Sequence, residues 1–367
     1  MDRPRSRPAV AATLCVAACA ILVLLATAPA ARAGDPTVSV AAHFPKALYR
    51  ASAVWTGTEA LVFGGTNDID VFADIVSYDT SDSRARLKGT LPDATMTAPA
   101  VWAGQDAFLF AGENGTALQS RVLRYRPATN ATTLMTARLP TTRIGASAAW
   151  DGHDGYIFGG HNGTAIETRV FRYNTTSDTM TLMSATMPVA SGGTSAVWTG
   201  EAVYIFGGKT AGGASNQILR FDPGTDTMSG LSVTLPGPRF HTSAVWDGES
   251  AYVFGGSDGA TALADIVRFT PATSEVTLLS ARLPSPREMT TAIWDGTDAY
   301  VFGGLSSDIL PLDEVVKVHP GGGAPDGLPV VWIGATIAVA ALVGVTAAAI
   351  VLRKTRRRVD EPGDARR

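Results

Sequence analysis

Basic and polar side chains recur at fixed places in this chain, and they are the residues best suited to bind a charged ligand. Some follow a regularly spaced proline by three or five positions, and the others come directly after a pair of small residues, usually two glycines. These candidate binding residues are Arg50, Glu113, Arg143, His161, Lys209, Arg239, His241 and Arg287. Guanidinium, ammonium and imidazolium groups form charge-assisted hydrogen bonds with carboxylates. The pattern therefore predicts a binding patch for acidic sugars or for an acidic protein loop.

Two other interpretations of these residues stay open. The three arginines that follow the proline by three places could instead bond backbone carbonyls at strand ends, as most side-chain donors do. Alternatively, Glu113 with His161 or His241 could supply the acid–base pair of a sugar isomerase or epimerase. The sequence contains no Gly-x-Ser-x-Gly elbow, and its five histidines lack H-x-x-x-H metal spacing. We therefore predict no catalytic residue, no metal site and no cofactor.

Four asparagines lie in N-x-T sequons, the acceptor pattern for N-glycosylation outside the cell. These asparagines are Asn114, Asn130, Asn162 and Asn174. All four lie in expected turns or loops of the second and third repeats. Glycans at Asn114 and Asn162 would cover that sector, and binding would then shift toward the fourth to sixth repeats.

A repeat of 47 or 48 residues positions all of these side chains. Its first mark is a Phe-Gly-Gly triplet, or a close variant, which begins at Phe63, Phe110, Phe158, Phe206, Phe254 and Phe302. Its second mark is a tryptophan, at Trp55, Trp102, Trp150, Trp198, Trp246 and Trp294. Its third mark is a proline, at Pro45, Pro92, Pro140, Pro188, Pro236 and Pro284. Three residue types in register over six copies predict a β-propeller with one four-stranded blade per repeat.

The fifth repeat shows the four strands most clearly. Residues 242–246 alternate in polarity and end at Asp247-Gly248, a pair typical of hairpin turns. The apolar run 251–254 ends at a glycine pair, and residues 266–269 and 276–279 form the third and fourth strands. Between residues 34 and 319 no segment has a helical pattern of useful length. The sequence therefore predicts an all-β fold.

The repeat resembles the kelch repeat. Apolar residues before Gly-Gly and an aromatic residue before Asn or Asp-Pro, as in Tyr173-Asn174 and Phe221-Asp222, carry this resemblance over about residues 38–320. It implies a six-bladed kelch-type propeller that binds a partner on the face of the post-glycine residues. The family's usual tryptophan after the third-strand aromatic residue is replaced here. The residues at that place are Thr132, Met180, Met228 and Val276.

The last repeat lacks a fourth strand, because its third strand, 315–318, runs into three glycines. The segment 38–45 precedes the first repeat and matches residues 277–284 of the fifth. We therefore expect 38–44 to form the outer strand of the sixth blade, so that both ends of the propeller share one blade and close the ring.

Both ends of the chain carry targeting patterns. Three arginines, an apolar run and Ala31-Arg32-Ala33 resemble a cleaved signal peptide, with an uncleaved anchor or lipidation at Cys19 as alternatives. An uncharged apolar stretch near the other end is followed by five basic residues, which the positive-inside rule places in the cytoplasm. The predicted organisation is a signal peptide (1–33), a six-bladed kelch propeller (34–319), a Gly/Pro tether (320–328), a transmembrane helix (329–352) and a basic cytoplasmic tail (353–367).

Cysteine and charge restrict the function further. The only cysteines, Cys15 and Cys19, lie in the expected signal, so the mature chain would lack disulfides and thiolate metal sites. Some kelch-like propellers are copper radical oxidases, and that class needs a cysteine bonded to tyrosine, so we exclude it. Without its termini the chain carries about ten more acidic than basic side chains, which repel nucleic acid.

Acidic residues also gather after the first and last glycine pairs. They are Asp68, Asp70, Asp74, Asp308, Asp313 and Glu314. Oxygen ligands at this density suit calcium, but the segment 67–70 lacks the glycine and distal glutamate of an EF-hand. A solvated acidic rim is the alternative, and no metal is predicted.

These observations predict a single-pass protein of the cell membrane with its propeller outside and its C-terminal tail in the cytoplasm. The predicted function is binding of an extracellular protein or glycan, by a chain that is a monomer or a weak homodimer. A sugar isomerase or epimerase and a structural cell-surface protein are the alternatives.

Overall fold

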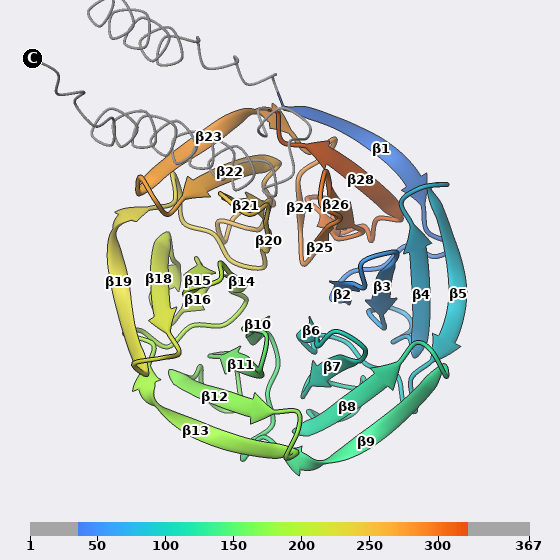
Figure 1. The fold of residues 1–367 in the computed structure, drawn as a ribbon. Coiled ribbons are helices and arrows are strands. Elements are labelled where there is room, and N and C mark those ends of the chain that lie inside the picture. Colours follow the sequence, from blue (N-terminus) through green and yellow to red (C-terminus); the bar gives the residue numbers. More distant parts are fainter. Residues whose placement is uncertain (1–35, 322–367) are drawn as a thin grey trace, which may run out of the picture. The chain divides into compact units, whose positions relative to one another are not determined.

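Residues 36–321, which this computed structural model describes, form six four-stranded antiparallel sheets arranged around a central channel (Figure 1). Each sheet is one blade, and each corresponds to one copy of the sequence repeat. The six-bladed, all-β prediction is therefore confirmed for these residues. The expected signal peptide, transmembrane helix and cytoplasmic tail lie outside them, as does most of the tether. Within 36–321, no helix is long and apolar enough to cross a membrane.

In blades 1 to 5 the strands run outward from the channel in chain order, and in blade 6 the outermost strand is β1. Blade 1 contains β2 (Ser52–Trp55), β3 (Ala60–Phe63), β4 (Asp74–Asp79) and β5 (Arg84–Thr90). Blade 2 contains β6 (Ala100–Trp102), β7 (Ala107–Phe110), β8 (Arg121–Arg126) and β9 (Ala131–Arg138). Blade 3 contains β10 (Ser147–Trp150), β11 (Asp154–Phe158), β12 (Arg169–Asn174) and β13 (Thr179–Thr186).

The remaining blades repeat this order with two small additions. Blade 4 contains β14 (Ser195–Trp198), β15 (Val203–Phe206), β18 (Gln217–Asp222), β19 (Thr227–Thr234) and the short hairpin β16 (Lys209–Thr210) and β17 (Gly213–Ala214). Blade 5 contains β20 (Ser243–Trp246), β21 (Ala251–Phe254), β22 (Asp265–Thr270) and β23 (Glu275–Arg282). Blade 6 contains β25 (Thr291–Trp294), β26 (Ala299–Phe302), β28 (Glu314–His319), β1 (Thr37–His43) and the short pair β24 (Arg287–Glu288) and β27 (Leu305–Ser306).

The ring closes as the sequence predicts. Strand β1 pairs antiparallel with β28, from Thr37 opposite His319 to His43 opposite Glu314. The N-terminal strand thus becomes the outer strand of blade 6, next to the beginning of blade 1 (Figure 1). Because Thr37 and His319 are neighbours, the described chain begins and ends at the same edge of blade 6.

The core is divided among the six interfaces between neighbouring blades. Each cluster joins two blades, and a tryptophan at the end of a first strand packs against the blade before it. Trp246 of blade 5, for example, packs on the cluster that contains Val197 and Phe206 of blade 4. Met180, Met228 and Val276, which stand where the family usually has tryptophan, pack against these clusters too.

The Phe-Gly-Gly triplet places two glycines where neighbouring blades touch. Gly255 has a φ of 53°, and a Cβ atom there would collide with the carbonyl oxygen of Arg287 in the next blade. A side chain at this position would therefore force the blades apart.

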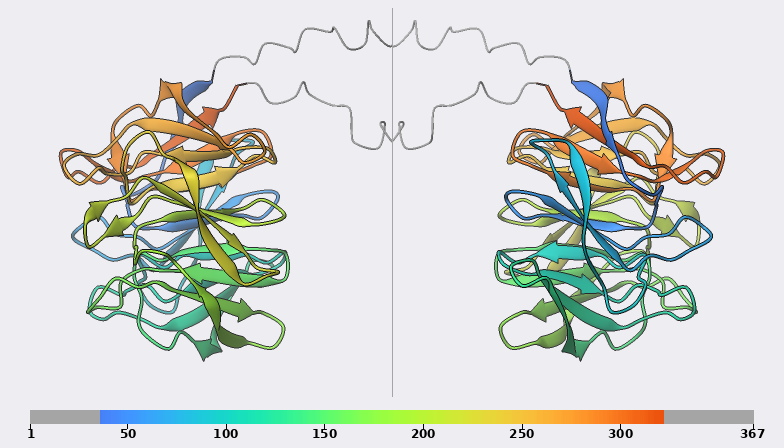
Figure 2. Two further views of the ribbon diagram at one scale, coloured as in Figure 1. Left: turned by 90° about the vertical axis from the view of Figure 1, so that its left-hand side faces the viewer. Right: turned by 90° about the vertical axis from the view of Figure 1, so that its right-hand side faces the viewer.

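Two sets of connections lie on opposite faces of the propeller, which Figure 2 shows from the side. The turns between the first and second strands of each blade share one face. The loops after the glycine pairs share the other face with the segments that enter each blade, since Met96 bridges to Glu113 in blade 2 and Ile144 to His161 in blade 3. His319 contacts Asp298 of a first-to-second-strand turn, with its Nδ1 2.8 Å from the carboxylate Oδ1. The described chain therefore ends on the face of those turns.

Candidate functional site

Six residues form a ring around one end of the channel, and each follows the repeat proline by five places. All of them have positive φ, between 56° and 66°. We call this ring the polar mouth; its residues are Arg50, Thr97, Gly145, Gly193, His241 and Met289. Five backbone N–H···O bonds link neighbours around it, at 2.6–3.0 Å. They run from Arg50 N to Met289 O, from Met289 N to His241 O, from His241 N to Gly193 O, from Gly193 N to Gly145 O and from Thr97 N to Arg50 O.

The left-handed conformation of this ring suits glycine, yet only two of its members are glycines. For other L-residues the conformation costs roughly 1–2 kcal/mol, and it is a genuine outlier for a β-branched residue such as Thr97. The bonds to neighbouring blades hold the four other residues in it. Arg50, Thr97, His241 and Met289 therefore bring side chains to the channel at a cost that glycine would avoid.

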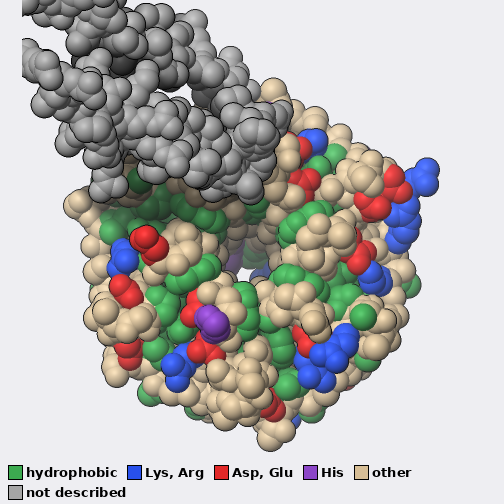
Figure 3. Space-filling view, viewed as in Figure 1, with side chains coloured by type: hydrophobic (Ala, Val, Ile, Leu, Met, Phe, Trp, Pro, Cys, Tyr) green, Lys and Arg blue, Asp and Glu red, His purple; other side chains and the backbone are tan. Residues whose placement is uncertain are grey.

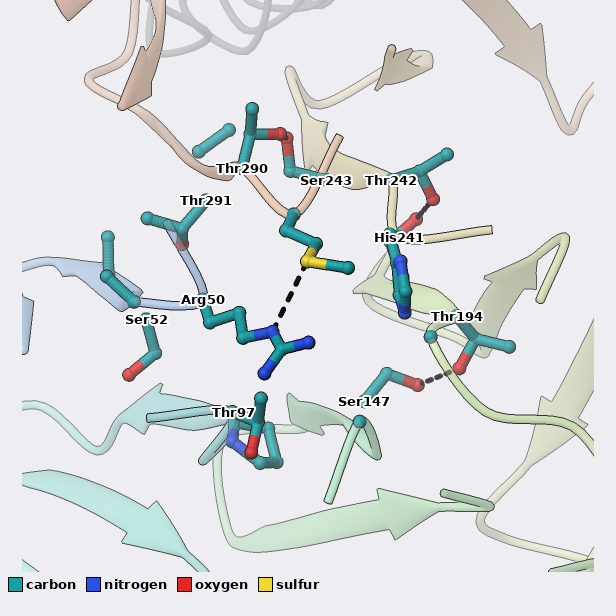
Figure 4. A pocket seen from close by; sticks show the side chains of 18 of the residues that line it. Arg50, Ser52, Thr97, Ser147, Thr194, His241, Thr242, Ser243, Thr290 and Thr291 are labelled. Atoms are coloured by element: carbon teal, nitrogen blue, oxygen red, sulfur yellow. Dashed lines mark hydrogen bonds between the residues drawn. The ribbon is translucent and has the colours of Figure 1, made fainter. Parts of the chain in front are cut away.

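The polar mouth opens a cavity of about 220 Å³ (Figure 4). Arg50 and Met289 meet on one side of it, where the Arg50 Nε donates to the Met289 Sδ at 3.3 Å. The His241 ring stands beside Gly193, where a Cβ atom would lie 2.5 Å from its Cδ2. Gly145 and Gly193 bring no side chain to the cavity, so one arc of the mouth exposes only backbone.

Each basic group of the mouth also has an acidic neighbour. Arg50 Nη1 lies 3.7 Å from Glu113 Oε1, and His241 Nδ1 lies 2.8 Å from Glu288 Oε2. The side chains of Arg50 and His241 keep 34% and 29% of their area exposed. Both groups are therefore oriented by a carboxylate while they stay accessible to a ligand.

Hydroxyl pairs support one half of this ring. Three of them cross between neighbouring blades at 2.8 Å, and two are drawn with dashed lines in Figure 4. The pairs are Ser147 with Thr194, Ser195 with Thr242, and Ser243 with Thr290. At the matching places of blades 1 to 3 stand Ala51, Ala98 and Ala146, which cannot form them. The inner strands of blades 3 to 6 are thus joined by side chains as well as by backbone.

The predicted patch is wrong in one respect, because Arg143, Arg239 and Arg287 are not exposed. Their relative exposure is 0%, 1% and 0%. Arg143 and Arg287 donate to the carbonyls of the first glycines of their own blades, and Arg239 and Arg287 also contact carboxylates, those of Asp265 and Glu314. Burial lowers the pKa of Arg143 to about 10, so it stays charged at neutral pH. The alternative interpretation, in which these arginines bond backbone carbonyls, describes their geometry.

His161 and Lys209 lie on the same face but do not line the cavity. The His161 Nδ1 accepts a hydrogen bond from the Gly163 N–H at 3.0 Å. The Lys209 ammonium lies 5.4 Å from the centre of the Phe240 ring, a cation–π contact. Of the eight predicted residues, the structure thus brings Arg50, Glu113 and His241 together around the channel.

Glu113 and His241, predicted as a possible acid–base pair of an isomerase, each contact another residue instead. Glu113 pairs with Arg50, and His241 pairs with Glu288. Glu288 precedes the mouth residue Met289, and nothing in its place in the repeat distinguishes it from the non-acidic residues there in other blades. Only the fold, which brings blades 5 and 6 together, reveals this contact.

The four sequon asparagines serve local structure. Asn114, Asn162 and Asn174 accept backbone N–H bonds within their own turns. Asn130 donates to the Lys88 carbonyl of the neighbouring blade at 2.9 Å. Whether any of them carries a glycan stays a prediction.

The six acidic residues of blades 1 and 6 are dispersed. Asp74 pairs with Lys46 at 2.9 Å, Asp313 with His43 at 2.9 Å, and Glu314 with Arg287. Within 36–321 no group of three or more histidine or acidic side chains converges as metal ligands would.

The opposite end of the channel has a different lining. A cavity of about 420 Å³ lies there among the last residues of the first strands. We call it the tryptophan mouth; its tryptophans are Trp55, Trp102, Trp150, Trp198, Trp246 and Trp294. Hydrophobic side chains surround the central opening in Figure 3. Because these indoles also pack between blades, the lining of this mouth belongs to the core.

Comparison with known proteins supports the fold. A family model described as the KLHDC2/KLHL20/DRC7 Kelch-repeats domain matches residues 97–304, which is more than half of the chain. No curated protein matches the chain.

Proposed function

The chain belongs to the kelch-repeat family, and on this basis we propose that its propeller binds a partner protein whose acidic side chain enters the polar mouth. Kelch propellers are typically protein-interaction modules. The observation that carries the proposal is the pair Arg50 and His241, which line one cavity on either side of Met289 in the ring. Both can donate hydrogen bonds to a carboxylate.

The size of the cavity favours a single side chain over a small molecule. Sites that enclose small molecules measure roughly 300–1,000 Å³, and the polar mouth holds about 220 Å³. A carboxylate at the tip of a partner's loop fits such a space, and the surrounding face would contact the rest of that loop. An acidic glycan group is the alternative ligand with the same chemistry.

We further propose that the propeller lies outside the cell and is anchored by 329–352. The support is the sequence pattern of both termini together with the place where the described chain ends. The last strand, β28, ends on the face of the first-to-second-strand turns. An anchor attached there by a short tether would leave the polar mouth directed away from the membrane.

Two measurements test this localisation. Alkaline carbonate washing of membranes is expected to leave the chain in the pellet, and protease added to intact cells is expected to degrade the propeller. Release by carbonate, or protection from protease, would contradict the proposal.

The binding role is tested with the full-length chain and a library of random 12-residue peptides. Enriched peptides are expected to contain aspartate or glutamate, and Arg50→Ala with His241→Ala is expected to weaken their binding at least tenfold. Arg84→Ala, which removes an exposed arginine from β5, is the matched control and is expected to leave binding unchanged. Acidic peptides that bind the double variant as tightly as the unchanged chain would refute the role of the polar mouth.

Acid–base catalysis on a sugar is a second candidate, favoured by one contact, His241 Nδ1 to Glu288 Oε2 at 2.8 Å. Isomerisation would exchange a carbon-bound proton of the sugar with solvent. Proton NMR of common aldoses and ketoses in D₂O, with the protein present, tests this. Exchange that is lost in Glu288→Gln would support catalysis, and absence of exchange in the unchanged protein would exclude it for those sugars.

A further inference from the structure

The loops after the glycine pairs have two kinds of tip. In blades 2, 3 and 5 the tip contains a glycine of positive φ, at Gly115, Gly163 and Gly259, with values of 87°, 96° and 99°. A threonine or alanine follows each glycine. These tips are small and polar, as expected for turns in water.

Blades 1 and 6 carry large apolar side chains in their tips. The tip of blade 1 is Asp68-Ile69-Asp70, and the tip of blade 6 is Asp308-Ile309-Leu310. The relative exposure of Ile69, Ile309 and Leu310 is 88%, 70% and 60%. Except for Leu87 on the outer strand β5, at 65%, no other large hydrophobic residue within 36–321 is as exposed.

The fold does not require these side chains. Ile309 has a φ of 59°, a left-handed conformation that is strained for a β-branched residue and that glycine adopts freely. Ile69 and Ile309 are not buried in the propeller, so they contribute little hydrophobic stabilisation to its fold. The tips of blades 2 and 3 close with the same backbone bond as the tip of blade 1 and carry no large apolar side chain, while the loop of blade 6 is one residue longer than the others.

The two tips lie side by side in the ring and on the face of the polar mouth. Blades 6 and 1 are neighbours, linked by bonds such as Leu48 N–H to Leu312 O at 3.0 Å and Arg50 N–H to Met289 O at 3.0 Å. Their other exposed groups are carboxylates. Within 36–321, Asp68, Asp70 and Asp308 form no ion pair, and Asp68 accepts a hydrogen bond from the Tyr49 hydroxyl.

We propose that the tips of blades 1 and 6 form a docking surface for a protein segment that carries apolar side chains next to lysine or arginine. Apolar contact with Ile69, Ile309 and Leu310 removes their surface from water. The three unpaired carboxylates attract the basic side chains and discriminate against acidic segments. This surface does not depend on the polar mouth, because it uses other residues and the opposite charge.

Charge and position both favour a protein partner over a lipid surface. Carboxylates beside the apolar tips are repelled by anionic headgroups. The tips also lie on the face opposite the end of β28, so the chain leaves the propeller on the other side.

The test uses the full-length chain and the same random 12-residue peptides, sorted by charge. Peptides with an apolar residue next to lysine or arginine are expected to be enriched. The triple variant Ile69→Ala, Ile309→Ala, Leu310→Ala is expected to weaken their binding at least tenfold. Asp70→Lys with Asp308→Lys is expected to weaken it to a similar degree. The matched control, Leu134→Ala with Leu182→Ala, truncates residues of the outer strands that are 51% and 55% exposed, and it is expected to bind normally.

Several results would overturn the proposal. The first is that no peptide with an apolar residue next to lysine or arginine is enriched. The second is that the triple variant and the control lose peptide binding equally. The third is that the chain binds phosphatidylcholine–phosphatidylserine vesicles and that the triple variant abolishes this binding. Self-association in analytical ultracentrifugation that disappears in the triple variant would identify a second copy of this chain as the occupant instead. Melting temperatures show whether each variant is folded. Ile309→Gly is expected to raise the melting temperature, because it relieves the left-handed conformation.

Discussion

The channel opens at one end between six tryptophans and at the other between Arg50, Thr97, Gly145, Gly193, His241 and Met289. At the tryptophan mouth the same side chain recurs in every blade. At the polar mouth the backbone conformation recurs, with φ between 56° and 66°, while the side chain differs. Both ends derive from one repeat, but one end repeats side-chain chemistry and the other repeats backbone geometry.

The physical reason lies in what joins the blades at each end. At the tryptophan mouth an indole packs against the preceding blade, so a change of residue leaves a cavity. At the polar mouth backbone N–H···O bonds join the blades, and these do not depend on the side chain. Side chains of the polar mouth can therefore vary, and this freedom makes it the better candidate for a binding site.

The largest loss of stability is expected for the buried arginines Arg143, Arg239 and Arg287, each of which lies two residues before a residue of the polar mouth. Arg287→Ala should lower the free energy of unfolding by about 3–5 kcal/mol, because it leaves the Glu314 carboxylate without its buried partner. Arg50→Ala, in the mouth itself, should cost less than about 1 kcal/mol. Urea denaturation of both variants measures the difference. Similar losses would show that the mouth residues serve stability as well.

At the tryptophan mouth, Trp246→Ala should lower the free energy of unfolding by about 3 kcal/mol. The indole contacts the cluster between blades 4 and 5, and alanine would leave a cavity there. Leu278→Ala, on the exposed side of β23, is the control and should cost well under 1 kcal/mol, as surface substitutions do. Equal stability of the two variants would contradict the packing role of the indole.

Two glycine substitutions separate backbone strain from crowding at the polar mouth. Gly145→Ala should cost about 1 kcal/mol for its positive φ alone, since its Cβ would lie 3.4 Å from the nearest atom. Gly193→Ala should cost about 2 kcal/mol, because its Cβ would also crowd the His241 ring at 2.5 Å. Only Gly193→Ala should weaken binding of acidic peptides. If both variants bind normally, the orientation of His241 is not important for binding.

The smallest expected effect is an increase in stability. Thr97→Gly removes a β-branched residue from a φ of 57° and should raise stability by less than about 1 kcal/mol. Ser52→Gly, in the adjacent strand β2, should instead lower it by roughly 0.5–1 kcal/mol. Thermal unfolding of the two variants tests the sign. A loss of stability in Thr97→Gly would mean that the ring tolerates threonine without strain.

Much of the fold could be predicted from the sequence because each blade is a local unit. Three marks in register identified the six repeats, and the missing fourth strand of the last repeat identified β1 as its replacement. The three marks recur within about 50 residues of chain, so spacing alone reveals them, and β1 is recognised because its sequence matches the fourth strand of another repeat. The predictions for 1–33 and for 329–367 rest on composition and stay predictions.

The candidate site was predictable only in part. Position in the repeat identified Arg50 and His241, but the same reasoning included three arginines that the structure buries. Sequence spacing does not show that the arginine three places after the proline is buried against its own blade, whereas the residue five places after it lines the channel. The residue five places after the proline is itself left-handed, and backbone bonds to the neighbouring blades hold it in that conformation.

The sequence by itself determined the number of blades, their order and the strand that closes the ring, because these follow from local hydrophobic and glycine patterns. The tertiary structure alone decided which basic groups face solvent, that His241 meets Glu288 and that Arg50 meets Met289. The last two residues are 239 positions apart in the chain and meet only when blade 6 closes on blade 1. The polar mouth is therefore a product of ring closure, and no single repeat contains it.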